Sequence, residues 1–239
     1  MSRTRWSVVI PAFNEARRLP RYLAEIVTYF DGRGEGYEVL VADDGSTDGT
    51  AESVAAIARA HEAVRVLRLD WNEGKGAAVR RGMLAARGDY RLFADADGAT
   101  PIGEVKRLEA ALAGGAQVAL GSRALRDPSV SVMARRHRVV AGRAFGWIVR
   151  GLAVPGIRDS QCGFKAFTAA AAADLFRRLR TTGFGFDVEL LLLARASGYR
   201  IVEVPVNWTD QPESKVRVLG NGPRMLWEVA LARLRTARR

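Results

Sequence analysis

The stretch YRLFADADGAT, residues 90–100, places two acidic residues and a glycine directly after an apolar run. The run Tyr90–Ala94 predicts a buried strand, and residues i and i+2 of an extended segment point the same way. The carboxylates of Asp95 and Asp97 can therefore converge on one site. Two hard oxygen ligands with room for water suit a Mg²⁺ or Mn²⁺ ion that bridges a diphosphate. The alternative interpretation is a solvated acidic loop without a ligand.

Strand-like and helix-like segments alternate on both sides of this stretch. The alternation predicts an α/β fold, with a mostly parallel central sheet that helices cover on both faces. One helix should take Thr47 or Asp48 as its cap and end near Ala60. Residues 211–221 should form a loop. We expect strands at 6–11, 37–42, 64–69, 90–94, 117–120 and 200–204, and further helices at 17–30, 76–86, 102–113, 169–178, 187–197 and 222–239.

Three other predicted strands also end in polar or glycine-rich segments, which read PAFNE (11–15), ADDGSTD (42–48) and WNEGKG (71–76). Ligands of parallel sheets bind at the carboxyl ends of the strands. A carboxylate after the second strand can bind a uracil imide or a ribose, although an Asp-rich turn is the alternative. The spacings of a P-loop and of a dinucleotide fingerprint are absent. The candidate nucleotide-binding residues are Pro11, Ala12, Asn14, Glu15, Asp43 and Asp44, with Lys75 as a counter-charge for phosphate.

The composition limits the classes of protein to which the chain can belong. With 239 residues, 48% of them hydrophobic, the chain can bury one sizeable core, so we expect a single domain over 1–239. A net charge of +11 favours an anionic partner, such as nucleic acid, a phospholipid surface or a phosphorylated substrate. The chain has no recognised nucleic-acid-binding motif and its strand ends are acidic, so we expect no nucleic acid among its partners.

Cysteine content and hydropathy predict the compartment. Cys162 is the single cysteine, which rules out an internal disulfide, and a packed thiol in a reducing compartment is expected. The apolar run near the N-terminus is too short for a signal peptide or a membrane span, and no other window is long enough. We therefore expect a cytoplasmic protein, either free or attached to a membrane surface.

Residues 132–154 are both basic and apolar, and they predict one or two amphipathic helices. Phe145, Trp147 and Ile148 beside a basic face are typical of a helix that lies on a membrane surface. An ordinary buried helix is the alternative. We expect peripheral association with the cytoplasmic face of a membrane, where an integral-membrane partner could supply the spans that this chain lacks.

The motifs together resemble a known family. The runs VVIPAFNE, VADDGSTDGT, NEGKGAAVRRGMLAARGDY and FADADGAT are similar to those of family 2 glycosyltransferases, which implies the GT-A fold. The later runs GIRDSQCGFKAFTAAAA, FGFDVELLLLA and IVEVPVNW resemble the dolichyl-phosphate (polyprenyl-phosphate) β-glucosyltransferase branch. The resemblance covers residues 6–217. It implies a nucleotide-binding half at about 1–122 and an acceptor-facing and membrane-facing half at about 123–239.

The resemblance also implies roles for individual residues. The nucleoside would be held by Pro11, Ala12, Asn14, Glu15 and Asp43, and the metal with its diphosphate by Asp95 and Asp97. The acceptor phosphate would meet Arg123 with Arg135, Arg136 and Arg138. The sugar would face Asp159 and Gln161, and the leaving diphosphate would be covered by Ser214, Lys215 and Arg217. This chain departs from some lipid-phosphate mannosyl relatives in having Ala99 where they have a third metal ligand. The catalytic residues would be Asp97, Asp159 and Arg123.

The implied reaction is inverting transfer of glucose from UDP-glucose to a polyprenyl monophosphate. Such an acceptor needs no strong general base, because its second pKa near ~6 leaves it mostly dianionic at neutral pH. A GDP-mannose-dependent mannosyltransferase is an alternative, and so is a family 2 transferase with a hydroxyl acceptor. The hydroxyl acceptor would require a carboxylate base, for which Asp159, Asp187 and Glu189 are the candidates. A non-catalytic sensor of sugar nucleotides would not need both Asp95 and Asp97.

Overall fold

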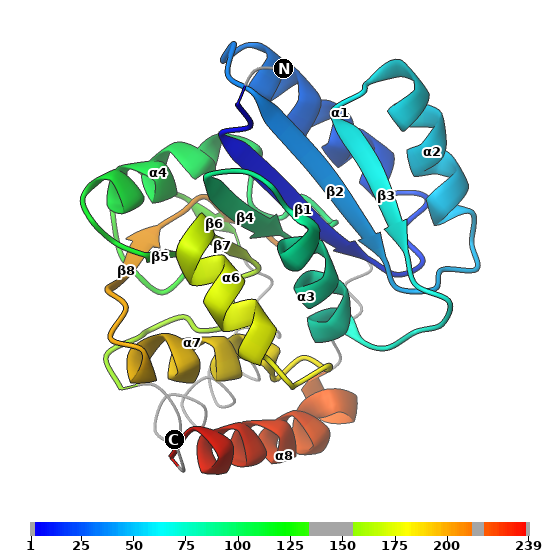
Figure 1. Cartoon of the computed structure of the whole chain (residues 1–239). Helices are drawn as coiled ribbons and strands as arrows, with labels where there is room; N and C mark the ends of the chain where they lie inside the picture. Colours follow the sequence, from blue (N-terminus) through cyan, green and yellow to red (C-terminus); the bar gives the residue numbers. More distant parts are fainter. Residues whose placement is uncertain (1–2, 134–154, 212–217, 238–239) are drawn as a thin grey trace.

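The computed structural model describes residues 3–133, 155–211 and 218–237 (Figure 1). Within these ranges one seven-stranded sheet has the strand order β3-β2-β1-β4-β7-β5-β8. Its strands run parallel, apart from β7, which is antiparallel to both of its neighbours. The mostly parallel α/β sheet that the sequence predicts is therefore confirmed. The strands are β1 (Trp6–Ala12), β2 (Tyr37–Asp43), β3 (Val64–Arg68), β4 (Tyr90–Ala94), β5 (Val118–Ser122), β7 (Phe164–Thr168) and β8 (Ile201–Pro205).

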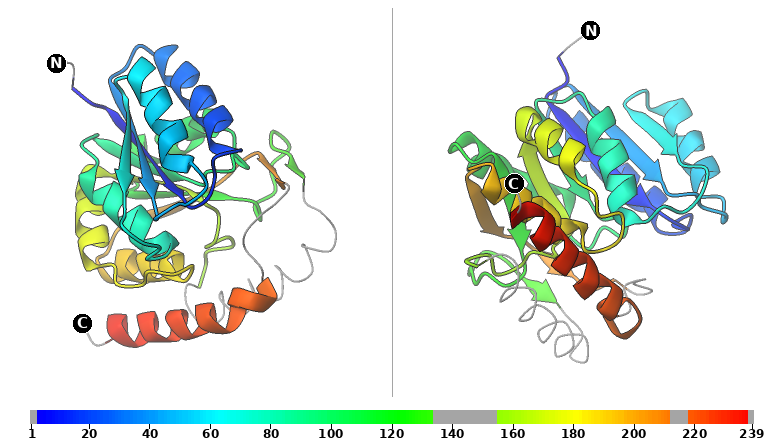
Figure 2. Two further views of the ribbon diagram at one scale, coloured as in Figure 1. Left: turned by 90° about the vertical axis from the view of Figure 1, so that its right-hand side faces the viewer. Right: turned by 60° about the horizontal axis from the view of Figure 1, so that its bottom comes forward.

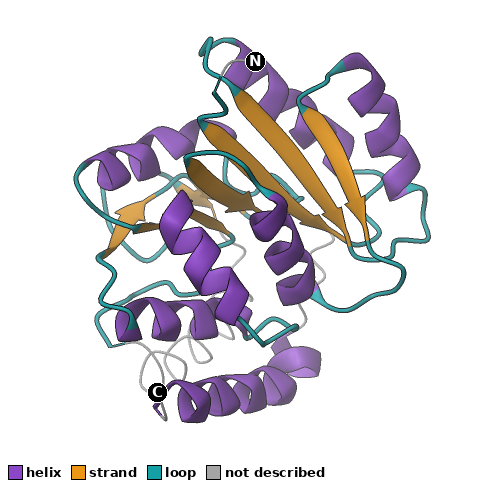
Figure 3. Ribbon diagram, viewed as in Figure 1, coloured by secondary structure: helices purple, strands orange, loops and turns teal. Residues whose placement is uncertain are grey.

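Helices cover both faces of the sheet, as Figures 2 and 3 show from three directions. Each face has its own hydrophobic core. The helix α8 (Val218–Ala237) lies outside this arrangement and packs on α7. The first face carries α1 (Leu19–Asp31), α2 (Thr50–Ala60), the 3₁₀ turn η1 (Ile102–Glu104) and α4 (Val105–Ala113), and the second carries α3 (Lys75–Ala85), α6 (Ala169–Arg178) and α7 (Phe186–Ala196).

The central strand β1 shows why this sequence forms a two-faced sheet. All seven of its residues are buried. Val8 and Ile10 pack into the core beneath α1, while Val9 between them packs against α3 on the opposite face. Side chains alternate between the two faces of a strand, so a strand that is covered on both faces reads as a continuous apolar run.

The strand β7 was not predicted, and it is the element that completes the site. It pairs with β4 in the register Ala94↔Phe164 and with β5 in the register Leu120↔Lys165. Because β7 is antiparallel, its first residue lies at the sheet edge where β4 and β5 end. The segment before β7, which includes Asp159 and Gln161, therefore reaches the same edge as Asp95. The charge of Lys165 in the short run FKAFT obscured the strand pattern.

Two predicted boundaries were wrong. α8 begins at Val218 and not at residue 222, so Pro223 lies inside the helix and residues 218–221 are not a loop. Proline suits a first helical turn, whereas further inside a helix, as at Pro223, it removes one backbone hydrogen bond. The N-cap of α2 is Gly49, with a φ of 85°, and not Thr47 or Asp48. Asp48 still accepts a hydrogen bond from the Thr50 amide at 3.1 Å.

The predicted amphipathic segment 132–154 lies mostly outside the described residues. Its first two residues, Val132–Met133, form the strand β6, which pairs in parallel with β9 (Trp208–Thr209). The helix predicted from residue 132 is therefore wrong at its start, because the backbone groups of these two residues pair with β9 and not within a helix. Among the helices that the structure describes, none has both the length and the hydropathy needed to cross a bilayer.

Candidate active site

The predicted acidic pair lies at the centre of the carboxyl edge of the sheet. Asp95 and Asp97 follow β4 directly, and the Asp97 carboxylate accepts a hydrogen bond from the Ala99 amide at 3.1 Å. Gly98 turns the chain with a φ of 63° and packs so closely on the Tyr22 ring that a Cβ would lie 2.9 Å from it. Burial raises the pKa of Asp97, and the charge of Asp95 raises it further. Two neighbouring carboxylates that repel each other in this way favour a cation between them.

Lys75 is the cation that contacts this pair. Its ammonium lies 2.5 Å from Oδ1 of Asp95. Lys75 is the first residue of α3, and the next amide, that of Gly76, donates to the carbonyl of Thr182 at 2.7 Å. Burial lowers the pKa of Lys75, but the charges of Asp95 and Asp187 outweigh this effect and raise it. Lys75 therefore stays protonated beside the acidic pair.

A buried ion pair of Lys165 and Asp187 lies near Lys75. Asp187 was predicted only as a candidate base for a hydroxyl acceptor, and Lys165 was not predicted as part of the site. Lys165 is fully buried, and its ammonium lies 2.6 Å from Asp187 Oδ1 and 2.5 Å from the carbonyl oxygen of Cys162. The ammonium also lies 5.2 Å from the centre of the Phe93 ring. A lysine in the middle of an apolar strand was the signal that could have identified this pair, because a buried charge requires a partner.

Arg123 and Asp159 form a second, bidentate ion pair at the end of β5. The guanidinium Nε and Nη2 donate to the two carboxylate oxygens at 2.7 and 2.8 Å, and the Arg123 amide donates at 2.9 Å. The guanidinium lies 5.4 Å from the centre of the Trp208 ring. Although burial favours the neutral acid, the Arg123 charge lowers the pKa of Asp159 to about 2. Next to this pair, Nε2 of Gln161 is buried without a hydrogen-bond partner among the described residues.

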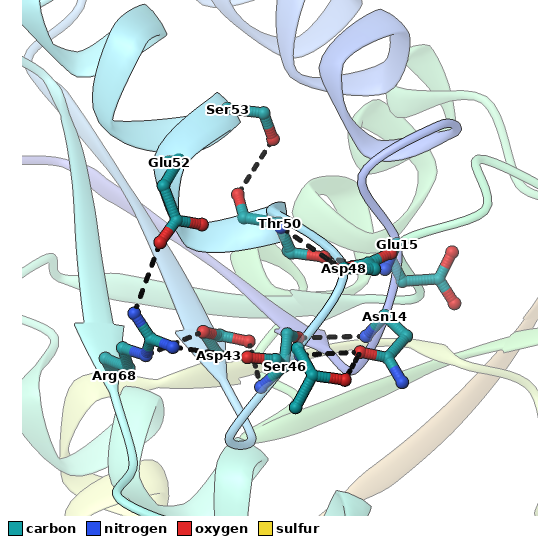
Figure 4. Close-up of polar contacts among 10 residues, drawn as sticks. Asn14, Glu15, Asp43, Ser46, Asp48, Thr50, Glu52, Ser53 and Arg68 are labelled. Carbon is teal, nitrogen blue, oxygen red and sulfur yellow. Dashed lines mark hydrogen bonds and ion pairs between the residues drawn. The ribbon is translucent and has the colours of Figure 1, made fainter.

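The loops after β1 and β2 are joined to one another by hydrogen bonds (Figure 4). The Asn14 amide donates to Ser46 Oγ, and the Asn14 side chain accepts from the Thr47 amide, both at 2.9 Å. The Glu15 amide donates to Thr50 Oγ1 at 2.8 Å. Asn14 adopts a φ of 53°, which is uncommon for a residue with a side chain. These bonds give the predicted nucleoside site a rigid rim.

The two aspartates after β2 have different surroundings. Asp43 is fully buried; its Oδ1 accepts from the Ser46 amide at 3.2 Å, and its Oδ2 lies 3.7 Å from Arg68 Nε. The two oxygens of Asp44 accept from the amides of Glu73 and Gly74, at 2.8 and 2.9 Å. Asp44 thus stabilises the loop that leads to Lys75. Nucleotide binding by Asp43 or Asp44 stays a prediction.

The remaining predicted residues divide into two groups. Pro11 and Ala12 are the last, buried residues of β1, and Glu15 forms an ion pair with Arg18 at 2.6 Å. Apart from Arg123, the residues predicted to meet the acceptor phosphate or to cover the leaving diphosphate lie outside the described ranges: Arg135, Arg136, Arg138, Ser214, Lys215 and Arg217.

The site fits a divalent cation that is bound by two protein ligands. In the described part of the chain, no group of three or more His, Cys, Asp or Glu side chains could hold a metal ion. Asp95 and Asp97 provide oxygen ligands, and the Lys75 ammonium already lies where a cation would meet Asp95. Mg²⁺ is commonly bound by one or two carboxylates together with substrate phosphates, so this donor set suits it.

Comparison with known proteins identifies the family of this chain. Residues 7–176 match the family described as glycosyl transferase family 2. The chain is 42% identical to dolichyl-phosphate beta-glucosyltransferase of Drosophila melanogaster over 88% of its own length and 68% of the relative. It is 39% identical to dolichyl-phosphate beta-glucosyltransferase of Homo sapiens over 88% of its length and 69% of the relative.

A solved structure shows the same fold at lower sequence identity. It is glucosyl-3-phosphoglycerate synthase from Mycobacterium tuberculosis, in complex with Mn²⁺, uridine diphosphate and glucosyl-3-phosphoglycerate. The TM-score is 0.71 and the identity is 22%, over 98% of this chain and 80% of that one. The family match, the relatives and this structural similarity together show that the chain belongs to glycosyl transferase family 2. It is a glycosyltransferase with the GT-A fold.

Proposed function

We propose that the protein transfers glucose from UDP-glucose to a polyprenyl monophosphate of the dolichyl type, with inversion, to give a lipid-phosphate β-glucose. The relatives in Drosophila melanogaster and Homo sapiens, both dolichyl-phosphate beta-glucosyltransferases by name, support a hexosyltransferase with this acceptor class. The chain spans more than two thirds of the length of each.

The observation that carries the proposal is that the three candidate bases for a hydroxyl acceptor, Asp159, Asp187 and Glu189, are all engaged by other groups. Asp159 is held by Arg123, and Asp187 by Lys165. Glu189 accepts hydrogen bonds from the amides of Thr181 and Arg180, at 2.6 and 3.2 Å. A phosphate acceptor fits this arrangement, because it is mostly dianionic at neutral pH, with a second pKa near ~6.

Asp95 and Asp97 would hold Mg²⁺ or Mn²⁺ in this proposal. The bound cation would neutralise charge on the diphosphate as it leaves. The solved relative that contains Mn²⁺ and uridine diphosphate supports a divalent metal in this fold. Lys75, at the N-terminus of α3, would bind a diphosphate oxygen, since helix N-termini and ammonium groups both favour phosphate.

The other predicted residues would orient the two substrates. Asp43, Asn14 and Glu15 would hold the nucleoside, and the buried amide of Gln161 would donate to the sugar. Arg123 would lie at the acceptor phosphate, with its guanidinium orientation fixed by Asp159. A phosphate oxygen would then form a bond to the anomeric carbon while the bond from that carbon to UDP breaks, which inverts the configuration. Asp44 would contact the nucleotide as well. The acceptor phosphate would also meet Arg135, Arg136 and Arg138, and the leaving diphosphate would be covered by Ser214, Lys215 and Arg217.

The proposal places the protein on the cytoplasmic face of a membrane, with residues 132–154 at the surface. The exposure of Val132 and Met133, at 39% and 59%, supports this location. The chain would act as one domain, with the nucleotide bound by about 1–122 and the acceptor by about 123–239. In the same proposal, an integral-membrane partner would supply the membrane spans.

An assay matrix tests the proposed function. UDP-glucose, UDP-galactose, UDP-GlcNAc and GDP-mannose are each supplied with polyprenyl phosphate or a soluble hydroxyl acceptor, and with Mg²⁺ or Mn²⁺. We expect turnover with UDP-glucose and polyprenyl phosphate, and its loss in Asp97→Asn. Turnover with GDP-mannose instead would show that the proposed donor is wrong. Turnover with the hydroxyl acceptor alone would show that the proposed lipid-phosphate acceptor is wrong.

A further inference from the structure

We infer that Lys75 acts as an internal counter-ion, which occupies the cation position at Asp95 in the free enzyme and moves to the diphosphate when donor and metal bind. Lys75 would thereby make the binding of metal and donor interdependent. The inference rests on the proposed function, because it requires a divalent cation at Asp95 and Asp97.

The first support is the position of the ammonium group. It lies 2.5 Å from Oδ1 of Asp95, within the contact distance of a cation and its oxygen ligand. The pair is partly shielded from water, with the Lys75 side chain 20% exposed and that of Asp95 36% exposed. A metal ion that approaches Asp95 without a nucleotide must therefore displace an ammonium group.

The second support is that the backbone of Lys75 is held while its side chain has a long flexible stem. The amides of Gly76 and Ala77 both donate to the carbonyl of Thr182, at 2.7 and 3.3 Å. Gly74 has a φ of 108°, and a Cβ on it would clash with the same Thr182 carbonyl. The ammonium can therefore change partner by rotation about its four-carbon stem, without movement of α3.

The third support is the charge balance around Lys75. Three carboxylates, of Asp95, Asp97 and Asp187, surround the two ammonium groups of Lys75 and Lys165. These five groups carry an excess of one negative charge, since the nearby Arg18 and Arg123 are each paired with a carboxylate of their own, Glu15 and Asp159. A divalent cation would therefore reverse the sign of the cluster. Lys75 then loses its attraction to Asp95, and it gains a new partner if diphosphate oxygens lie at the N-terminus of α3.

These three observations predict a specific coupling. The metal alone competes with Lys75 and binds weakly, whereas the diphosphate draws Lys75 away and frees the Asp95 oxygen. By linkage, the metal must strengthen donor binding by the same factor that the donor strengthens metal binding. Removal of the Lys75 charge should strengthen metal binding without nucleotide, although it removes a favourable contact with the diphosphate.

The test measures Mn²⁺ binding to the full chain by electron paramagnetic resonance of free Mn²⁺, in the absence of any nucleotide. We expect Lys75→Gln to bind Mn²⁺ about tenfold more tightly than the wild type, the effect of removing a competing ion. UDP should bind Lys75→Gln more weakly than the wild type in the presence of Mn²⁺. Lys75→Arg, which keeps the charge, should bind Mn²⁺ alone as weakly as the wild type.

Arg81→Gln is the matched control. It removes the same charge from the same helix, at an exposed position, and should leave Mn²⁺ affinity unchanged. Unfolding curves verify that each variant is folded, and Lys75→Met serves as a second neutral variant.

Two outcomes separate the inference from the proposed function. Without nucleotide, both Lys75→Gln and Lys75→Met should bind Mn²⁺ more tightly than the wild type and Arg81→Gln. If neither does, the counter-ion role of Lys75 is wrong. If instead Asp97→Asn binds Mn²⁺ with UDP as tightly as the wild type, the metal site of the proposed function is wrong.

Discussion

The backbone of Gly163 packs directly against the carboxylate of Asp95. The Asp95 amide donates to the Gly163 carbonyl at 2.9 Å, and a Cβ on Gly163 would overlap the Asp95 carboxylate carbon and both oxygens. We predict that Gly163→Ala displaces this carboxylate and lowers kcat/KM by about 10- to 100-fold, as is typical when the support of a metal ligand is disturbed. Initial rates of sugar transfer, measured at several Mn²⁺ concentrations, test the prediction.

The control for this substitution is Gly222→Ala in α8, where a Cβ would have no neighbour within 4 Å in the part of the chain that the structure describes. Its activity should match that of the wild type. If Gly163→Ala has the same metal dependence and the same kcat/KM as this control, the close contact does not position Asp95.

The buried pair of Lys165 and Asp187 gives a prediction about stability. Asp187→Asn would leave the Lys165 ammonium buried without its carboxylate, and should lower the free energy of unfolding by about 3–5 kcal/mol. The double variant Lys165→Met with Asp187→Asn should lose less, because no uncompensated charge remains buried. Urea-induced unfolding, followed by circular dichroism, measures all three proteins.

Asp174→Asn is the matched control for the buried pair. Asp174 lies 2.9 Å from Arg178, but the side chains are 34% and 28% exposed, so solvent screens the pair. Its loss should cost at most about 1 kcal/mol. Equal costs for Asp187→Asn and Asp174→Asn would contradict the special role of burial at Lys165.

The sequence predicted the parts of the site that follow directly from strand periodicity. Asp95 and Asp97 are identifiable because a buried apolar run ends immediately before them, and parallel strands bring their carboxyl ends to one edge. The same argument placed Asn14, Glu15 and Asp43 at that edge, and the structure shows them there. The register of β1 with β2, Ala12↔Asp43, is the physical reason.

What the sequence could not predict depends on contacts between distant segments. Lys165 interrupts a short apolar run, and only its partner Asp187, 22 residues away, explains its burial. The antiparallel direction of β7 follows from its pairing with β4 and β5, which local periodicity does not contain. The contacts of Asp44 with the amides of Glu73 and Gly74, about thirty residues away, could likewise not be read from the sequence, and its role as a nucleotide ligand stays a prediction.

The pair of Arg123 and Asp159 predicts a specific dependence of stability on pH. Despite burial, which raises it, the pKa of Asp159 falls from 3.8 to about 2 through the charge of Arg123. A carboxylate with a lowered pKa stabilises the fold above its unfolded pKa, and this stability is lost as the pH falls toward the folded pKa. The shift is worth roughly 2 kcal/mol, lost between about pH 5 and pH 2.

Asp159→Asn tests this dependence. The variant should be less stable than the wild type at pH 6, and the difference in free energy of unfolding should shrink as the pH falls from 5 to 2. Equilibrium unfolding in urea at each pH provides the measurement. A difference that stays constant over this range would show that ionisation of Asp159 does not contribute.

Cys162 gives a prediction about chemical reactivity. The thiol is 1% exposed, and burial raises its pKa to about 12, a direction that the charge of Asp159 reinforces. Only the thiolate attacks a disulfide reagent, so the folded protein should react with dithionitrobenzoate far more slowly than a free cysteine does at pH 8. The rate should rise with urea in parallel with the unfolded fraction, because unfolding exposes the thiol and returns its pKa to about 8.5. Rapid labelling of the native protein would mean that the segment before β7 opens without global unfolding, and that Gly163 does not hold Asp95 rigidly.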